Sequence, residues 1–286
     1  MKKEVLITER SIKKFEKYMR EQERSTSTIS NYIHELRALQ FYSDGEAITK
    51  TKLLEYKSIL NDRYKPSTVN VSVAAINSYL KFIGRNDIAL KPVRVQKNSF
   101  EENDKELNKS DYERLTVTAY KNGDERLALA VQTICSTGIR VSELQYITVQ
   151  AIADGHTIIA CKGKRRTLFL PQKLCRLLKQ YCDKRCITQG AVFVTSGGKP
   201  LDRSNLWKQM KRLCEQAKVQ KSKVYPHNLR HLFARTYYNR EKDLSRLADI
   251  LGHSSINTTR IYTRECGAVH ARQIEGLGLI RNTTQC

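Results

Sequence analysis

The sequence predicts a mainly helical, α+β protein of two domains, with a small β-hairpin in the second domain. Three observations predict this class. Apolar residues recur at helical spacing through the first hundred residues, a polar aperiodic stretch follows near residue 100, and two short β-type runs flank a basic turn near residue 165. The 286 residues are enough for two domains. We expect a helical domain at 1–95, a linker at 96–106 and a larger domain at 107–286.

The first domain is expected to hold four helices. The clearest begins after Pro66 and ends at Gly84, and its apolar positions lie four, three, four and three residues apart, which forms one stripe along a helix. These positions are Val69, Val73, Ile76, Leu80 and Ile83. The other three segments are expected near residues 8–20, 25–36 and 52–62. Four helices with short connections form a small all-α domain.

The second domain is expected to be helical apart from short strands. The polar, charged run 91–108 has no helical period and is interpreted as containing the linker. The elements expected after it are, in order, a helix capped by Ser110–Asp111, a buried helix at 127–134, a hairpin of strands 156–161 and 167–170 around KGKRR, a short strand at 191–195, and further helices up to a last segment at 267–279.

The net charge predicts a large acidic partner, and nucleic acid fits it best. The formal charge is +22, and Lys+Arg exceed Asp+Glu by 8 in the first hundred residues and by 14 in the remaining 186. Both parts are basic, so a ligand gripped from two sides would fit. The alternative is a generally basic, solvated surface.

Neither a membrane span nor a disulfide framework is predicted. No apolar run approaches the roughly 20 residues that a span needs, and the N-terminus has no signal-peptide pattern, so we expect a cytoplasmic protein. The eight cysteines form no CxxC pair. Cys182 and Cys186 are close enough on a helix to leave a metal site open, but reduced thiols are the preferred interpretation.

Arg140 and Glu143 form the first candidate pair. Arg140 follows Thr137–Gly138, where a helix should break, and precedes a short helix that starts at Val141. A guanidinium held at such a junction can present two parallel N–H donors to a phosphate. Glu143 lies one helical turn further on and can fix Arg140 or a nearby histidine. A surface arginine and an exposed glutamate are the alternatives.

His227 and Arg230 form the second candidate pair. They lie three residues apart, on one side of a helix that begins at Pro226, so His227 is near the positive N-terminal end, where anions bind. An imidazole and a guanidinium suit a phosphate under attack, because one handles a proton and the other spreads negative charge. A helix-capping pair is the alternative. His231 is expected to face elsewhere, in a structural role.

Tyr262 is the candidate nucleophile, nine residues after His253, which follows Gly252 at an expected helix C-cap. One tyrosine among fourteen carries no claim by itself. A phenol has a pKa of about 10 and needs adjacent positive charge or a base to attack at neutral pH. The two arginines and two histidines supply both if they converge on Tyr262.

Four segments of the second domain, in this order, resemble the tyrosine recombinase (phage integrase) family. They are TGIRVSEL at 137–144, CKGKRR at 161–166, HNLRH at 227–231 and LGHSSINTTRIYTR at 251–264. The resemblance covers about residues 107–279, and the helical front part resembles the family's SAM-like core-binding domain more loosely. It implies a DNA-binding core-binding domain at 1–95 and a catalytic domain at 107–286 that ends in an exchange tail.

Carried over position by position, the resemblance implies an enzyme that cleaves and rejoins duplex DNA through a 3′-phosphotyrosyl bond. Tyr262 would attack the scissile phosphate, and Arg140 and Arg230 would hold its non-bridging oxygens. His227 would act as a general base or hydrogen-bond donor, with His253 as a second donor.

The resemblance also assigns two supporting groups. Glu143 matches the acidic residue that supports the site. A lysine on the hairpin turn would protonate the leaving 5′ oxygen, and Lys162 matches the family's KG turn. The turn is about a residue shorter than the common form, so Lys164 stays open.

The implied partners are a double-stranded DNA recombination site and further copies of the chain, as a tetramer of two dimers on paired sites. The tail at 269–279 would dock onto a neighbouring protomer; packing on its own domain is the alternative. No cofactor or metal is expected, because two arginines, a lysine and two histidines can neutralise a phosphorane. The start of the chain at the core-binding helices favours a simple Xer-like or small mobile-element recombinase.

Two other functions stay open at this point. A type IB topoisomerase shares the same Arg-Lys-Arg-His-Tyr chemistry and works as a monomer, and a DNA-binding regulator would perform no chemistry. The DNA target and the choice among integration, excision, resolution and inversion are not predicted.

Overall fold

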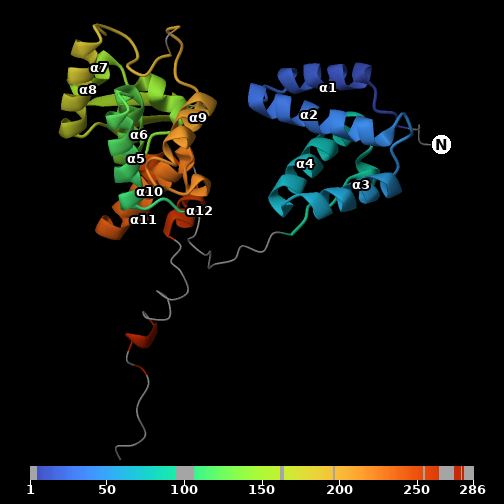
Figure 1. Ribbon diagram of the computed structural model, residues 1–286. Helices are drawn as coiled ribbons and strands as arrows, with labels where there is room; N and C mark the ends of the chain where they lie inside the picture. Colours follow the sequence, from blue (N-terminus) through green and yellow to red (C-terminus); the bar gives the residue numbers. More distant parts are fainter. Residues whose placement is uncertain are drawn as a thin grey trace, which may run out of the picture. The chain divides into compact units, whose positions relative to one another are not determined.

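The computed structural model describes residues 5–94, 106–161, 164–195, 197–253, 255–263, 274–277 and 279. The chain divides into two compact units, Met1–Lys97 and Asn98–Cys286, which are considered in turn. The described residues form helices and one two-stranded sheet (Figure 1), which confirms the mainly helical class. Among these residues, none of the helices combines the length and apolar character that crossing a membrane requires.

The described residues of the first unit, 5–94, form four α-helices, as predicted. They are α1 (Glu9–Glu21), α2 (Thr26–Ser43), α3 (Lys50–Arg63) and α4 (Pro66–Phe82), followed by the 3-10 turn η1 (Asn86–Ile88). Side-chain oxygens of Thr8, Ser25 and Thr49 cap the first three helices, and proline stands at the first position of α4. Of the predicted stripe on α4, positions 69, 73, 76 and 80 are buried in the core of this unit.

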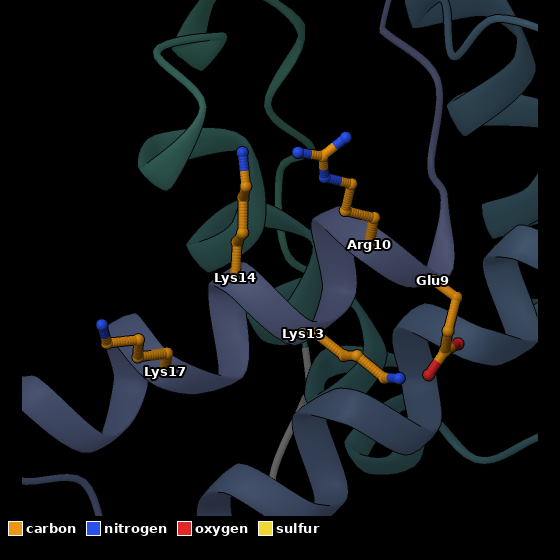
Figure 2. A pocket seen from close by; sticks show the side chains of 5 residues that line it. All are labelled: Glu9, Arg10, Lys13, Lys14 and Lys17. Carbon is orange, nitrogen blue, oxygen red and sulfur yellow. The ribbon is translucent and has the colours of Figure 1, made fainter.

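The outward face of α1 is strongly basic. The opposite face packs into the core through Ile12, Phe15 and Met19. Four exposed cations occupy the outward side: Arg10, Lys13, Lys14 and Lys17 (Figure 2). Glu9 borders them, but Arg37 of α2 binds its carboxylate at 2.7 Å. The spacing of three and four residues aligns the cations along one side of the helix.

The second unit is larger and carries the sheet. Its elements are α5 (Lys109–Lys121), α6 (Glu125–Thr137), η3 (Val141–Tyr146), α7 (Val149–Asp154), β1 (His156–Cys161), β2 (Lys164–Phe169), α8 (Gln172–Lys184), α9 (Arg203–Leu213), η4 (Lys221–Lys223), α10 (Pro226–Glu241), α11 (Leu244–Leu251), α12 (Ile256–Thr259) and η5 (Arg260–Thr263). Helix α6 packs against α5, α8, α9 and α10. Its residues 127–131 and 134 are buried, which confirms the predicted buried helix.

Three predicted boundaries were wrong. Asn108, not Ser110–Asp111, caps α5, because its side chain and that of Asp111 exchange hydrogen bonds with each other's backbone N–H. Strand β2 begins at Lys164 rather than 167, where it pairs with Cys161. Residues 191–195 form only isolated bridges, Thr148 with Ala191 and Val194 with Pro200, because the segments beside them, 147–149 and 199–201, each bridge to them at one point only. Most of the predicted last segment, 267–279, lies outside the described residues.

Two glycines at helix ends distinguish two costs of adding a side chain, which are backbone strain and crowding by neighbouring atoms. Gly123 and Gly138 both have positive φ, +73° and +66°. A Cβ on Gly123 would meet no atom within 4 Å, whereas a Cβ on Gly138 would lie 2.5 Å from Cδ1 of Phe233 and 2.9 Å from Cδ2 of Leu251. Only glycine therefore lets α6 end so close to α10 and α11.

We expect Gly123→Ala to lower the free energy of unfolding by about 1 kcal/mol, the cost of a left-handed alanine. Gly138→Ala should cost roughly 2–4 kcal/mol, because overpacking adds to the same strain. Urea unfolding followed by the fluorescence of Trp207, the chain's single tryptophan, measures both in the second unit. Equal losses in the two variants would contradict the close packing at Gly138.

Candidate active site

A buried carboxylate joins two arginines from different elements. Glu143 in η3 is 3% exposed. Its Oε1 accepts from Nη1 of Arg140 at 3.0 Å, and its Oε2 accepts from Nη2 of Arg166 at 2.6 Å and from the backbone N–H of Arg140 at 2.9 Å. This position excludes an exposed helix glutamate. Arg140 is held at the start of η3, yet 41% of its side chain stays exposed.

Arg230 on α10 is held by the ends of two other helices. It is 2% exposed, its Nη1 donates to the carbonyl of Gly138 at 2.5 Å, and its Nη2 donates to the carbonyl of Leu251 at 2.6 Å. Gly138 and Gly252 are left-handed C-caps, which confirms the helix ends predicted there. The carbonyls at a helix C-terminus lack intrahelical donors and carry partial negative charge, so they suit a buried cation.

Arg230 stays charged in this setting. Burial lowers its pKa to about 10, the charge of Arg140 acts in the same direction, and interaction with Tyr262 opposes the shift. A pKa of about 10 still leaves the guanidinium protonated at neutral pH. Its position also excludes a simple helix-capping pair with His227, because the guanidinium bonds to the ends of other helices.

His253 is neutral, and its tautomer follows from its partners. Nη2 of Arg230 lies 3.0 Å from Nε2, and since arginine only donates, Nε2 accepts. Nδ1 then carries the proton and donates to Oγ1 of Thr259 at 2.8 Å. Burial first, then the charges of Arg230 and Arg140, lower the pKa of His253 to about 4.

Tyr262 lies in η5 against three imidazoles. It is 5% exposed. The ring centroid of His231 lies 4.5 Å from that of Tyr262, edge to face at 87°; His253 lies at 5.8 Å and His227 at 6.4 Å. The structure thus brings His227, His253 and Arg230 together at Tyr262, a convergence that the sequence left open. Figure 1 shows α10, α11 and α12, which carry or adjoin these residues, side by side at one end of the second unit.

The expectation for His231 was wrong. It faces both Tyr262 and His227, with a ring distance of 4.5 Å to each. The signal was present, because residues four apart share a helix face and His231 follows His227 at that spacing. Burial, followed by the charges of His227 and Arg230, lowers the pKa of His231 to about 4. Burial likewise lowers the pKa of His227.

Arg166 is a further site residue that sequence reasoning missed. Besides its ion pair with Glu143, it donates through Nη1 to the carbonyl of Leu251. Strand alternation could have found it, since Arg166 and the buried Leu168 share one face of β2. Arg140, Glu143, Arg166 and His253 line one cavity of about 1130 Å³.

The hairpin lysines are described only in part. Lys162 lies outside the described residues, and for Lys164 only the backbone position is described, at the first residue of β2 opposite Cys161. Within the described ranges no group of three or more His, Cys, Asp or Glu side chains could hold a metal ion. The thiols of Cys182 and Cys186 are free there.

Known proteins share both the sequence pattern and the fold. The Phage integrase family model matches residues 105–266. Tyrosine recombinase XerA of Pyrococcus furiosus is 29% identical over 281 residues, covering 95% of this chain and 95% of that protein. Tyrosine recombinase XerC of Herpetosiphon aurantiacus is 31% identical over 237 residues, covering 76% and 75%.

Solved structures agree in fold. The XerH site-specific recombinase bound to its difH substrate matches with a TM-score of 0.68 at 22% identity, covering 94% of this chain and 89% of that chain. A lambda integrase dimer bound to a COC′ core site matches with a TM-score of 0.71 at 16% identity, covering 90% and 95%.

This fold, with a buried tyrosine among arginines and histidines, defines the class of enzymes that break and rejoin DNA strands. The family match spans more than half of the 286 residues. The chain belongs to the phage integrase family of tyrosine recombinases. It is a site-specific recombinase that cleaves and rejoins DNA.

The histidines make stability depend on pH. The folded pKa of His231 and His253 is about 4, below the ordinary value of about 6.5, so the unfolded chain binds more protons between these values. Their contribution to stability is complete above about pH 6.5 and is lost as the pH falls toward 4. We expect His231→Asn to flatten this decline, measured by urea unfolding between pH 7.5 and 4.5.

The exposed His156 on β1 provides the matched control. His156→Asn should leave the slope of stability against pH unchanged. If His231→Asn and the wild type lose stability in parallel, His231 is not buried as a neutral group in solution.

Proposed function

We propose that the enzyme cuts DNA by transesterification at Tyr262. Its phenolic oxygen attacks the scissile phosphorus, a 3′-phosphotyrosyl bond forms, and the bond to the 5′ oxygen breaks to leave a 5′ hydroxyl. The reverse attack by a 5′ hydroxyl rejoins the strand and releases the tyrosine. The observation that carries this proposal is the convergence of Arg230 and three histidines on one buried tyrosine.

Arg140 and Arg230 are proposed to bind the non-bridging oxygens of the phosphate. Glu143 engages Nη1 and the backbone N–H of Arg140, and the exposed part of its guanidinium lines the cavity. Arg230 is buried and prealigned by two carbonyls, so it needs no reorganisation when negative charge develops. Glu143 would support the site by holding Arg140.

His227 is proposed to accept the proton of Tyr262, and His253 to donate to the phosphate once its Nε2 is protonated and released from Arg230. Without DNA, burial and arginine charges keep both imidazoles neutral. A bound phosphate brings negative charge that offsets the arginines, so it raises the basicity of the imidazoles at the moment when a proton must be taken up. This coupling restricts proton transfer to the occupied site.

A core-binding domain at 1–95 and a catalytic domain at 107–286 are both proposed to contact the DNA. The lambda integrase structures include a dimer on a COC′ core site and a tetramer on a Holliday junction. We propose that this chain likewise acts in the cytoplasm as a tetramer of two dimers on paired recombination sites, with its C-terminal segment docked on a neighbour. Strand exchange between two sites, rather than relaxation alone, separates this activity from that of a type IB topoisomerase.

Tyr262→Phe should abolish the covalent protein–DNA adduct on a nicked suicide substrate, because it removes the attacking oxygen. DNA affinity should stay within about threefold of wild type, since the ring and its packing remain. Gel electrophoresis of the adduct and a binding titration measure the two effects. Tyr238→Phe, a tyrosine near the end of α10 beside Lys242, is the control that should still form adduct. An adduct in Tyr262→Phe would refute the nucleophile assignment.

The leaving-group acid is proposed to be Lys162, with Lys164 as the alternative on the same hairpin. A general acid contributes about 10²–10⁴-fold to the rate. We expect Lys162→Ala to slow single-turnover cleavage by about 100-fold or more on an ordinary substrate, and much less when sulfur replaces the leaving 5′ oxygen, because a thiolate leaves without a proton. Lys164→Ala on the same pair of substrates decides between the lysines. Equal damage on both substrates would argue against an acid role.

The basic face of α1 is proposed to contribute phosphate contacts. Each neutralised phosphate adds about 0.9 to the slope of log affinity against log salt concentration. Lys14→Gln with Lys17→Gln should therefore reduce that slope by up to about 2, measured by DNA titrations at several salt concentrations. Arg20→Gln is the control, because Glu16 pairs with Arg20 at 2.6 Å, whereas Glu21 approaches Lys17 only to 3.9 Å. An unchanged slope in the double variant would remove this face from the interface.

A further inference from the structure

Arg166 contacts the anchors of both phosphate-binding arginines. One of its N–H groups binds Oε2 of Glu143, the carboxylate that holds Arg140. Another binds the carbonyl of Leu251, which also accepts from Arg230. The planar guanidinium spans the two anchors with donors that keep a fixed geometry.

Arg166 lies on the hairpin that carries the two candidate leaving-group lysines. β1 and β2 form a two-stranded sheet, and a two-stranded hairpin alone is marginally stable in water. Arg166 pairs with the buried Ile159, whereas the next pair toward the turn, Ala160 with Arg165, is exposed. Arg166 is therefore a partly buried attachment of the hairpin, two residues after Lys164 and four after Lys162.

Gly252 leaves space for the side chain of Arg166. A Cβ on Gly252 would lie 2.8 Å from both Cδ and Nη1 of Arg166. Gly252 also has a φ of +64°, so glycine serves the helix end and the close approach of the side chain together. The charge of Arg166 reaches the site as well, since it helps to lower the pKa of His253 after burial, Arg230 and Arg140.

We propose that Arg166 is a positioning residue that fixes the hairpin, and with it the leaving-group lysine, against the phosphate-binding arginines. This inference rests on the proposed function of the hairpin lysine. Arg166 itself transfers no proton. Its loss leaves Tyr262 and its histidines in place but releases β2 from Glu143 and Leu251.

The test compares Arg166→Met and Arg166→Lys on the oxygen and sulfur versions of the suicide substrate in single-turnover cleavage. A misplacement of about 1 Å can cost about 100-fold, so we expect Arg166→Met to slow the oxygen substrate by about 100-fold and the sulfur substrate by less than about tenfold. Arg166→Lys keeps the charge but cannot bind Glu143 and Leu251 in the same planar geometry, so the same relief by sulfur is expected.

Arg246→Ala is the matched control, because it removes an exposed arginine from α11 without touching this network. It should cleave both substrates at the wild-type ratio. Thermal unfolding and DNA affinity are measured for every variant, and if Arg166→Met does not fold, Arg166→Lys decides the outcome. Equal slowing on both substrates, or wild-type rates in Arg166→Lys, would overturn the positioning role.

The lysine variants show whether a negative result contradicts the acid role of the hairpin lysine or only the positioning role of Arg166. If sulfur relieves Lys162→Ala or Lys164→Ala but not the Arg166 variants, the hairpin lysine keeps its role and only the inference on Arg166 falls. If sulfur relieves neither lysine variant, the acid is not on the hairpin and the positioning role falls with it.

Discussion

The carboxylate of Glu143 is the interaction on which the site depends. Burying an unpaired charge costs several kcal/mol, and breaking a buried pair leaves that cost uncompensated. Glu143 is buried between Arg140 and Arg166. The loss of either guanidinium would therefore leave the buried carboxylate without one of its two charged partners. Through Arg166 the same network extends to the carbonyl of Leu251 and so to Arg230.

The network leaves an excess of positive charge in one place. Arg140 and Arg166 share one carboxylate, and the charges of both act on the nearby Arg230. Burial and this excess keep His231 and His253 neutral, and they favour an anion in the adjoining cavity. A DNA phosphate completes the charge balance, so substrate binding and the readiness of Tyr262 to react are linked electrostatically.

Local backbone signals predicted much of this arrangement. Glycines at 138 and 252 and the proline at 226 end or begin helices where expected, and those ends carry Arg140, His253 and His227. The contacts of His231 and Arg166 were missed, because they depend on which helix ends and strands meet in space. Periodicity could have placed His231 on the face of His227 and Arg166 on the face of Leu168, but it does not show what lies opposite a face. The segment 191–195 has strand-like composition, yet a strand also needs a continuous ladder, and the neighbouring segments bridge to it only at Thr148 and Pro200.

The most direct test of the central claim is to locate the bond between protein and DNA. The adduct trapped on a nicked suicide substrate is digested with nuclease and trypsin, and the modified peptide is sequenced by mass spectrometry. Cleavage after the arginines at 260 and 264 isolates the peptide Ile-Tyr-Thr-Arg, which contains one tyrosine. We expect the nucleotide remnant on Tyr262 in this peptide. A remnant on any other residue would contradict the site described for this recombinase.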